Sequence, residues 1–204
     1  MGIPIGSQML LETLGMSLSS IMVGWFGAVA LASHQIAMNL SSLTFMISGG
    51  LASATTIRVS HQIGKKDFHS MRKAGIASTH LSLLFSFICA VVLFVFRSQI
   101  ASFFTIDPAV LQLSSLLIAI VALYQFGDGY QVVSIGALRG LSDVYAPMVV
   151  AIVCYLIVNL SFAYVLAVIC GWGVVGVWVA FMIELYLAAL LLGIRFYHKT
   201  RQYR

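Results

Sequence analysis

Long runs of apolar residues, separated by short polar or glycine-rich segments, dominate this chain of 204 residues. The runs are continuous rather than alternating, and about 20 apolar residues in a helix suffice to cross a bilayer. The pattern therefore predicts an all-α, polytopic membrane protein in which residues 1–204 form a single transmembrane unit of about six helices with no soluble domain. The predicted helices are Gly2–Trp25, Val29–Gln62, Ser70–Phe96, Ala109–Leu138, Val144–Ile169 and Gly173–Tyr197.

Turn-forming and capping residues stand between the predicted helices. Residues 24–27 (Gly-Trp-Phe-Gly) and 171–173 (Gly-Trp-Gly) predict short connections. Asp107 is a predicted N-cap, because it is followed by a proline in the first helical position. Residues 142–143 (Ser-Asp) are expected to cap the helix that follows them.

Charged residues make up only 8% of the chain, whereas a soluble domain carries about 25%. So few charges cannot cover a water-exposed surface, which excludes a soluble globular protein, a disordered chain and a nucleic-acid-binding domain. The expected surroundings are a lipid bilayer. The net charge of +5 reflects membrane topology, because ten of the eleven Lys and Arg residues fall on one side of the predicted helices and only Arg97 on the other. Both termini are therefore expected in the cytoplasm.

Three acidic residues, Glu12, Asp128 and Glu184, lie within predicted membrane helices. A charge at the bilayer centre costs about 2.5–3.5 kcal/mol on insertion scales, so each acid needs a reason to be there. Glu12 lies ten residues from the cytoplasmic end of its helix and Asp128 eleven residues before Arg139, or ~15 Å in both cases. The two acids are thus expected at the same depth, with Tyr124 one turn from Asp128.

Two nearby carboxylates in a medium of low dielectric constant cannot both stay charged and unpaired. No Lys or Arg is expected at their depth, so the pair is interpreted as an ion-coupling site that takes a proton or a sodium ion. The alternative is an interhelical hydrogen bond between two permanently protonated acids. Glu184 is either such a protonated acid or a secondary proton site. No other metal site and no cofactor is predicted.

Several further side chains are candidates for a substrate path, because they share a helix face with Glu12 or Asp128 or lie on or beside a polar face of the second predicted helix. They are Gln8, Gln35, Asn39, Phe45 and Gln131. His34 is expected near the outer end of its helix, as an interfacial residue rather than a proton relay.

A series of short motifs resembles the C-terminal half of a multidrug and toxic compound extrusion (MATE) transporter, that is, its helices 7–12. The strongest of these motifs is Gly136-Ala137-Leu138-Arg139-Gly140. The others, in order, are residues 2–12, 22–37, 53–64, 103–108 and 125–133. Each motif is modest evidence alone, and their common order carries the resemblance.

The resemblance implies a multidrug efflux transporter of the bacterial inner membrane. It would exchange cationic, amphipathic toxic compounds for Na⁺ or H⁺ by secondary active antiport, with no cofactor. In the sodium-coupled branch of the family, a Glu in the seventh helix and a Tyr and an Asp one turn apart in the tenth form an ion site. Those positions match Glu12, Tyr124 and Asp128 in this chain.

The length departs from the family, because its members resemble two six-helix lobes and this chain supplies one. The expected partner is therefore the N-terminal lobe, and the alternatives are an inactive truncated fragment, a half-transporter from a split gene or a homodimer. An intramembrane aspartyl protease is a further alternative, because Gly127-Asp128 fits a membrane-embedded catalytic aspartate. Such a protease needs a second aspartate at the same depth. Asp107 and Asp143 lie at helix ends, so no enzyme is expected.

Overall fold

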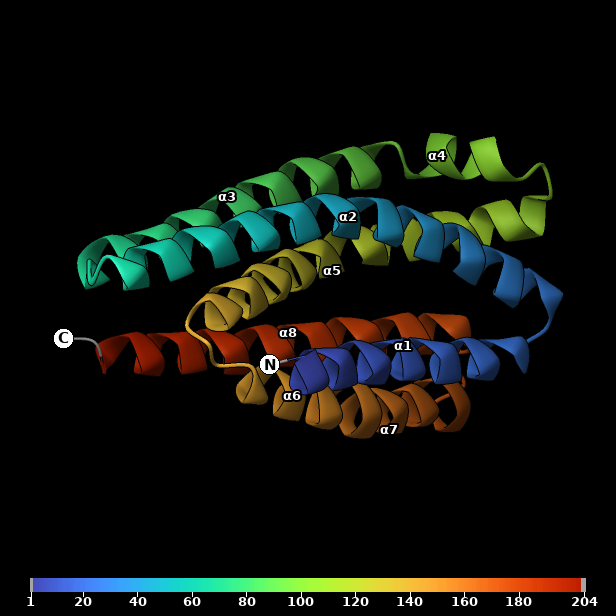
Figure 1. Ribbon diagram of the computed structural model, residues 1–204. Coiled ribbons are helices and arrows are strands. Elements are labelled where there is room, and N and C mark those ends of the chain that lie inside the picture. The colour runs from blue at the N-terminus through green and yellow to red at the C-terminus, as the bar shows by residue number, and fades with distance from the viewer. Residues whose placement is uncertain (1, 203–204) are drawn as a thin grey trace.

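The computed structural model describes residues 2–202, and in that part of the chain the elements are helices without strands (Figure 1). The six long helices predicted from the sequence are confirmed, with ends that differ by a few residues. Five of them are α1 (Gly2–Gly24), α2 (Ala28–Gly64), α3 (Phe68–Val95), α5 (Pro108–Gly140) and α8 (Val174–Arg201). The sixth is continuous over residues 145–169 and contains α6 (Tyr145–Ala151), η1 (Ile152–Val158), α7 (Asn159–Tyr164) and η2 (Val165–Ile169).

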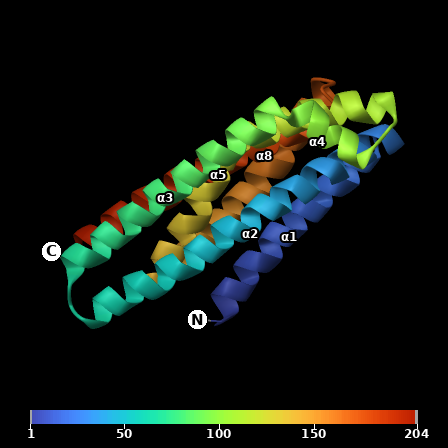
Figure 2. The same cartoon turned by 90° about the horizontal axis from the view of Figure 1, so that it is seen from above.

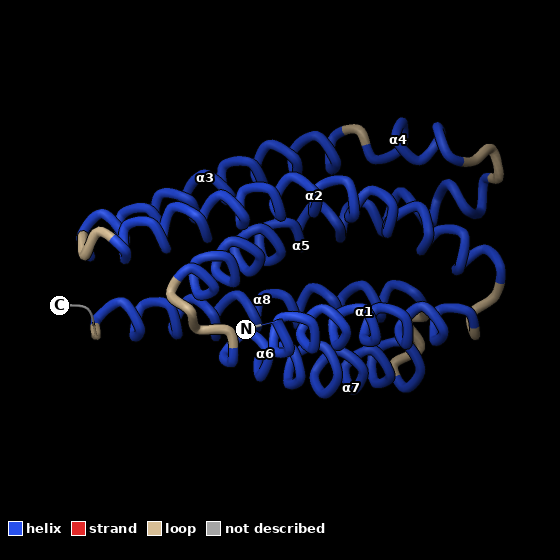
Figure 3. Tube along the Cα trace, in the orientation of Figure 1, coloured by secondary structure: helices blue, strands red, loops and turns tan. Residues whose placement is uncertain are grey.

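Five of these helices are long and apolar enough to cross a membrane, and α1 is the exception. α1 has 23 residues, or ~34 Å, which is sufficient length for a span, but it carries Gln8 and Glu12. One short helix, α4 (Arg97–Phe104), was not predicted and lies in the connection between α3 and α5. The remaining connections are short (Figure 3).

The helices form two groups that meet along α5 and α8. α2, α3 and α5 lie together, and α1 lies against the helix of residues 145–169 (Figure 1). In the view of Figure 2, α1 and α2 lie along one side of the bundle and α3 and α8 along the other. About half of the membrane-spanning segments of α5 (50%) and α8 (56%) is buried, against 22% for α2 and α3, so α5 and α8 form the centre.

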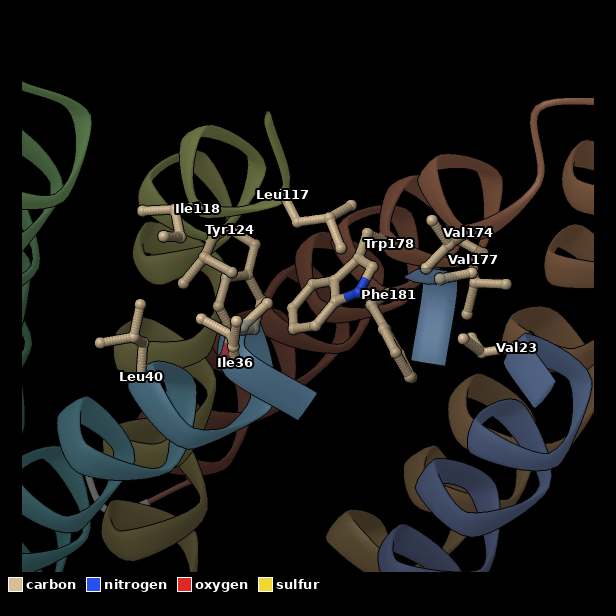
Figure 4. Packing of buried hydrophobic residues seen from close by; sticks show 14 of the residues in the cluster. Val23, Ile36, Leu40, Leu117, Ile118, Tyr124, Val174, Val177, Trp178 and Phe181 are labelled. Carbon is tan, nitrogen blue, oxygen red and sulfur yellow. The ribbon is translucent and has the colours of Figure 1, made fainter. Parts of the chain in front are cut away.

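Aromatic residues of α5 and α8 anchor the largest apolar core. The ring of Trp178 meets those of Tyr124 and Phe181 edge-on, at centroid distances of 6.0 and 5.5 Å (Figure 4). Val23 of α1 and Ile36 of α2 belong to the same buried cluster. This packing fixes Tyr124, which the sequence placed in the ion site, between the two central helices.

α2 and α5 touch through their backbones at one glycine. A Cβ atom on Gly136 would lie 2.4 Å from the carbonyl oxygen of Ala52, so no larger residue fits. The Thr56 hydroxyl donates a hydrogen bond of 2.8 Å to the Gly136 carbonyl oxygen at the same crossing. Glycine thus allows a close helix crossing of the kind that is common in membrane proteins.

The two predicted caps have different outcomes. Asp107 is the N-cap of α5, and its carboxylate accepts a hydrogen bond of 2.9 Å from the backbone N–H of Ala109, as predicted. The predicted Ser142-Asp143 cap is wrong, because the residue before α6 is Val144 and no side chain caps that helix. Asp143 instead forms an ion pair of 2.8 Å with Arg195 of α8, which occupies its carboxylate.

Candidate functional site

The acids identified from the sequence line one cavity of about 300 Å³. Glu12 comes from α1, Asp128 from α5 and Glu184 from α8. Tyr124 lines the same cavity, one helical turn from Asp128. The rest of the wall of this acid cavity consists of Met9, Thr13, Met16, Met38, Ser41, Ser42, Phe45, Tyr155, Trp178, Phe181 and Leu185.

Two of the three acids are almost completely shielded from solvent. Asp128 is 6% exposed and Glu184 is 1% exposed. One oxygen of each, Oδ2 of Asp128 and Oε2 of Glu184, has no hydrogen-bond partner among the described residues. Most buried polar atoms in proteins have a hydrogen-bond partner, and an exception calls for an explanation such as strain, a chemical role or a bound ion. Glu184 therefore lies with the two other acids, although the sequence could not place it there.

Gln8 links the Arg139 side chain to Glu12 in the wall of the acid cavity. The Gln8 side chain donates a hydrogen bond of 2.8 Å from Nε2 to Oε1 of Glu12, and its Oε1 accepts one of 3.2 Å from Nη2 of Arg139. No Lys or Arg is expected at the depth of the acids, yet Arg139 is linked to Glu12 through Gln8. Arg139 lies near the end of α5, but its long side chain extends from there towards α1, which helix position alone does not reveal.

A second cavity of about 380 Å³ adjoins the acid cavity on the side of Arg139. The two cavities share Met9, Glu12, Phe45 and Tyr155, so Glu12 lies at the junction between them. The rest of the second cavity is lined by Gln8, Met46, Gly49, Ala52, Ser53, Thr56, Gln131, Val132, Ile135, Gly136 and Arg139. An acid at such a junction can exchange protons or cations with both spaces.

Tyr155 is a site residue that the sequence reasoning missed. It lies in η1, lines both cavities, and its hydroxyl accepts a hydrogen bond from Nε2 of Gln131. α1 packs closely against it, because a Cβ atom on Gly15 would lie 3.0 Å from the Tyr155 carbonyl oxygen. The available signal was an isolated tyrosine in an otherwise apolar run, since a buried tyrosine hydroxyl usually has a polar partner.

The five candidate path residues divide into two sets. Gln8, Phe45 and Gln131 line one or both cavities. Gln35 and Asn39 are exposed and line neither cavity, because α2 turns a different face, with Met38 and Ser41, towards the acids. Helical spacing grouped these positions correctly along α2 but could not decide which face points inwards.

His34 is buried rather than interfacial, which corrects the expectation from its position in α2. It is 1% exposed, and its Nδ1 accepts a hydrogen bond of 3.1 Å from Nε1 of Trp178. An indole N–H can only donate, so the proton of a neutral imidazole lies on Nε2, which is 3.0 Å from the Ser20 hydroxyl oxygen. His34 therefore links α1, α2 and α8 beside the wall of the acid cavity.

The chemistry of the lining suits a proton or a hard cation. Carboxylate and hydroxyl oxygens are the only strong ligands that Glu12, Asp128 and Tyr124 offer. Within residues 2–202, no group of three or more His, Cys, Asp and Glu side chains is arranged to hold a metal ion. Besides the carboxylates, the lining offers a sodium ion the hydroxyl oxygens of tyrosine, serine and threonine.

Ionisable side chains inside membrane helices often mark substrate or ion pathways, so acids around an internal cavity are typical of a membrane transporter. The MatE family model matches residues 4–165, and the chain belongs to this family, that of the MATE transporters. A probable multidrug resistance protein NorM of Xanthomonas campestris is 38% identical over 201 residues, which covers 98% of this chain and 44% of the relative. A protein of the same name from Bacillus cereus is 32% identical over 203 residues and matches 100% of the chain and 45% of its own length.

Solved structures have the same fold. The eukaryotic MATE transporter AtDTX14 superposes with a TM-score of 0.89 at 18% identity, over 100% of this chain and 47% of its own. A transporter of the MOP superfamily from Pyrococcus furiosus gives a TM-score of 0.86 at 19% identity, over 94% of this chain and 42% of its own. The chain thus spans about half the length of the relatives that it matches. The family is one of transporters, which agrees with the expectation that the chain is not an enzyme.

Proposed function

We propose that this chain is one lobe of an exporter that moves cationic, amphipathic compounds out of the cell in exchange for Na⁺ or H⁺. The observation that carries the proposal is the cavity shared by Glu12 of α1 and by Tyr124 and Asp128 of α5, two helices that are distant in sequence. The family membership and the names of the NorM relatives support the substrate class.

The physical basis is competition for negative charge. Carboxylates in a space of low dielectric constant repel one another strongly, so the pair of Glu12 and Asp128 needs a proton or a cation to be stable. An inward-moving Na⁺ or H⁺ and an outward-moving organic cation then bind in turn to the same acids. Aromatic and methionine side chains in the wall, such as Phe181 and Met16, suit the apolar part of such a compound.

Glu184 and Arg139 give this site an asymmetry. Glu184 adds a third acid, deeply buried, which we assign as a secondary proton site. Arg139 supplies positive charge to Glu12 through Gln8, on the side of the second cavity. Glu12 thus differs from Asp128 and Glu184 in having a hydrogen-bonded link to a cation.

We further propose that the chain lies in the bacterial inner membrane with both termini in the cytoplasm. The start of α1, the turn between α2 and α3 and the end of α8 lie towards the same end of the bundle (Figure 2). That end carries the excess of Lys and Arg, which favours the cytoplasmic side.

A second lobe is the proposed partner. Side chains at the mouth of the cavities are exposed in the single chain: Met9 is 58% exposed, Phe45 45% and Met46 71%. A second six-helix lobe that packs over α1 and α2 would cover them and close the cavities. The alternatives, a second copy of this chain or an inactive fragment, predict different results in the same experiment.

The experiment measures ethidium export from bacterial cells that lack their own exporters. The chain is produced alone and together with the N-terminal half of the Xanthomonas campestris relative. Export only with the second lobe supports the proposal, export by the chain alone supports a homodimer, and export in neither case supports an inactive fragment. Glu12→Gln and Asp128→Asn should then each abolish export, whereas Asp107→Asn, at a helix end, should retain it. Normal export by both acid variants would overturn the coupling site.

A further inference from the structure

A groove of about 730 Å³ is lined by residues of α3, α5 and α8. α3 and α8 lie on the side of the bundle opposite to α1 (Figure 2). The groove shares no lining residue with the acid cavity or with the second cavity. Its walls include Leu83, Phe126, Leu190 and Ile194, so it is largely apolar. The transport cycle proposed above assigns it no role.

Two glycines, which have no side chain, leave space for the groove. Gly127 and Gly193 line it, and a Cβ atom on Gly193 would lie 2.5 Å from the hydroxyl oxygen of Tyr130. On α8 the lining runs from Tyr186 to His198, twelve residues or ~18 Å. One leaflet of a bilayer has a hydrocarbon depth of about 15 Å, so the groove matches the length of a single acyl chain layer.

Two arginines lie over the ring of Tyr197, a wall residue at the end of the groove near His198. The guanidinium carbon of Arg72 from α3 lies 5.4 Å from the centroid of the Tyr197 ring, and that of Arg201 lies 4.6 Å from it. Arg201 also donates a hydrogen bond of 2.8 Å to the Tyr197 hydroxyl. Among the described residues neither arginine pairs with a carboxylate, since the ion pair found there joins Arg195 and Asp143.

An apolar groove of one leaflet's depth that ends at two uncompensated guanidinium groups complements one kind of molecule in both charge and shape. We propose that the groove binds an anionic phospholipid of the leaflet on the Arg-rich side, which positive-inside bias makes the cytoplasmic one. Its phosphate lies between Arg72 and Arg201, and an acyl chain follows the groove along α8. Arginine suits this role because its planar fork donates several hydrogen bonds to phosphate oxygens.

Native mass spectrometry of the purified chain in neutral detergent tests the proposal. Dioleoyl phosphatidylglycerol should bind in preference to dioleoyl phosphatidylcholine, and inorganic phosphate should not displace it. Arg72→Ala or Arg201→Ala should each weaken binding of the anionic lipid about fivefold, as expected for one basic side chain near an anionic headgroup. Arg97→Ala is the matched control, because Arg97 also lies over an aromatic ring, 5.0 Å from the Phe94 centroid, but away from the groove.

A groove-filling variant distinguishes binding of the acyl chain from binding of the headgroup. Ile194 is 48% exposed, so Ile194→Trp should fold and fill the groove. It should weaken dioleoyl phosphatidylglycerol but leave the dihexanoyl form unaffected. The proposal is wrong if the arginine variants keep the full preference for anionic lipid, if Ile194→Trp leaves long-chain binding unchanged, or if inorganic phosphate displaces the lipid. These measurements involve no transport, so their outcome is independent of the proposed antiport.

Discussion

The indole N–H of Trp178 donates a hydrogen bond to Nδ1 of His34, at 3.1 Å, beside the wall of the acid cavity. Both side chains are buried, with 1% exposure each. The bond joins α8 to α2, and the contact of His34 with the Ser20 hydroxyl extends it to α1. A histidine in this place thus connects the helices that enclose the acids.

Replacing this histidine should loosen the bundle. In His34→Ala the indole N–H of Trp178 loses its partner in a buried place, which costs about 1–3 kcal/mol. We expect a lower temperature of unfolding in detergent, measured by circular dichroism. His80→Ala is the control, because His80 is exposed and bonds only to the Ile76 carbonyl of its own helix. Equal effects of the two variants would contradict the structural role of His34.

Gln8 should control how strongly Glu12 binds the coupling ion. Gln8→Leu removes both hydrogen bonds that connect Glu12 to Arg139, and hydrogen bonds to charged groups contribute about 1.5–3 kcal/mol. Under the proposed function we expect about a tenfold or greater change in the concentration of coupling ion that gives half-maximal export. Gln35→Leu, on the exposed face of α2, serves as the control and should leave that concentration unchanged. An unaltered value for Gln8→Leu would show that Arg139 does not act on Glu12.

The crossing of α2 and α5 should be intolerant of a single methyl group. Gly136→Ala places a Cβ atom against the Ala52 carbonyl oxygen, which is backbone and cannot swing aside. We expect a loss of about 1–3 kcal/mol, the usual cost of overpacking. Gly49→Ala has nothing within 4 Å of the new atom and should be neutral or stabilising, since alanine is the better helix former. Thermal unfolding of both variants in detergent gives the comparison.

The start of α3 should depend on pH through Asp67, which lies in the turn after α2, outside the membrane spans. Hydrogen bonding to Ser70, through its side chain and then its backbone N–H, lowers the pKa of Asp67 from the usual 3.8. A lowered pKa means that the carboxylate stabilises the cap above pH 3.8 and loses this effect as the pH falls through the lower, folded pKa. We expect amide exchange in the first turn of α3 to accelerate in that range. Asp67→Asn should remove the pH dependence, and an unchanged profile in this variant would contradict the assignment.

Much of the architecture could be predicted because a bilayer imposes simple rules on sequence. The long apolar runs, the glycine turns at 24–27 and 171–173 and the Asp107 cap each report a local requirement, and the structure confirms them. The depth of Glu12 and Asp128 also follows from counting residues along a helix. The shared cavity of these acids agrees with that count.

The parts that could not be predicted depend on rotation and reach rather than on position along a helix. Which face of α2 points inwards is decided by its packing on α5, so Gln35 and Asn39 are predicted as path residues although they line neither cavity. The reach of Arg139 towards Gln8 and the use of Asp143 by Arg195 depend on the conformations of long side chains. Glu184 and Tyr155 come from helices whose neighbours only the folded chain reveals.

The contact between Gly136 and Ala52 also has a mechanical consequence for the acid cavity. Backbone touching backbone makes α2 and α5 a stiff wall, which carries Asp128. The opposite wall is α1, which packs on residues 145–169: a Cβ atom on Gly15 would lie 3.0 Å from the Tyr155 carbonyl oxygen, and Asn159 donates a hydrogen bond of 3.2 Å to Ser19. Glu12 and Asp128 therefore belong to two separately packed groups of helices. Under the proposed function, a cation that binds both acids would bridge these two groups.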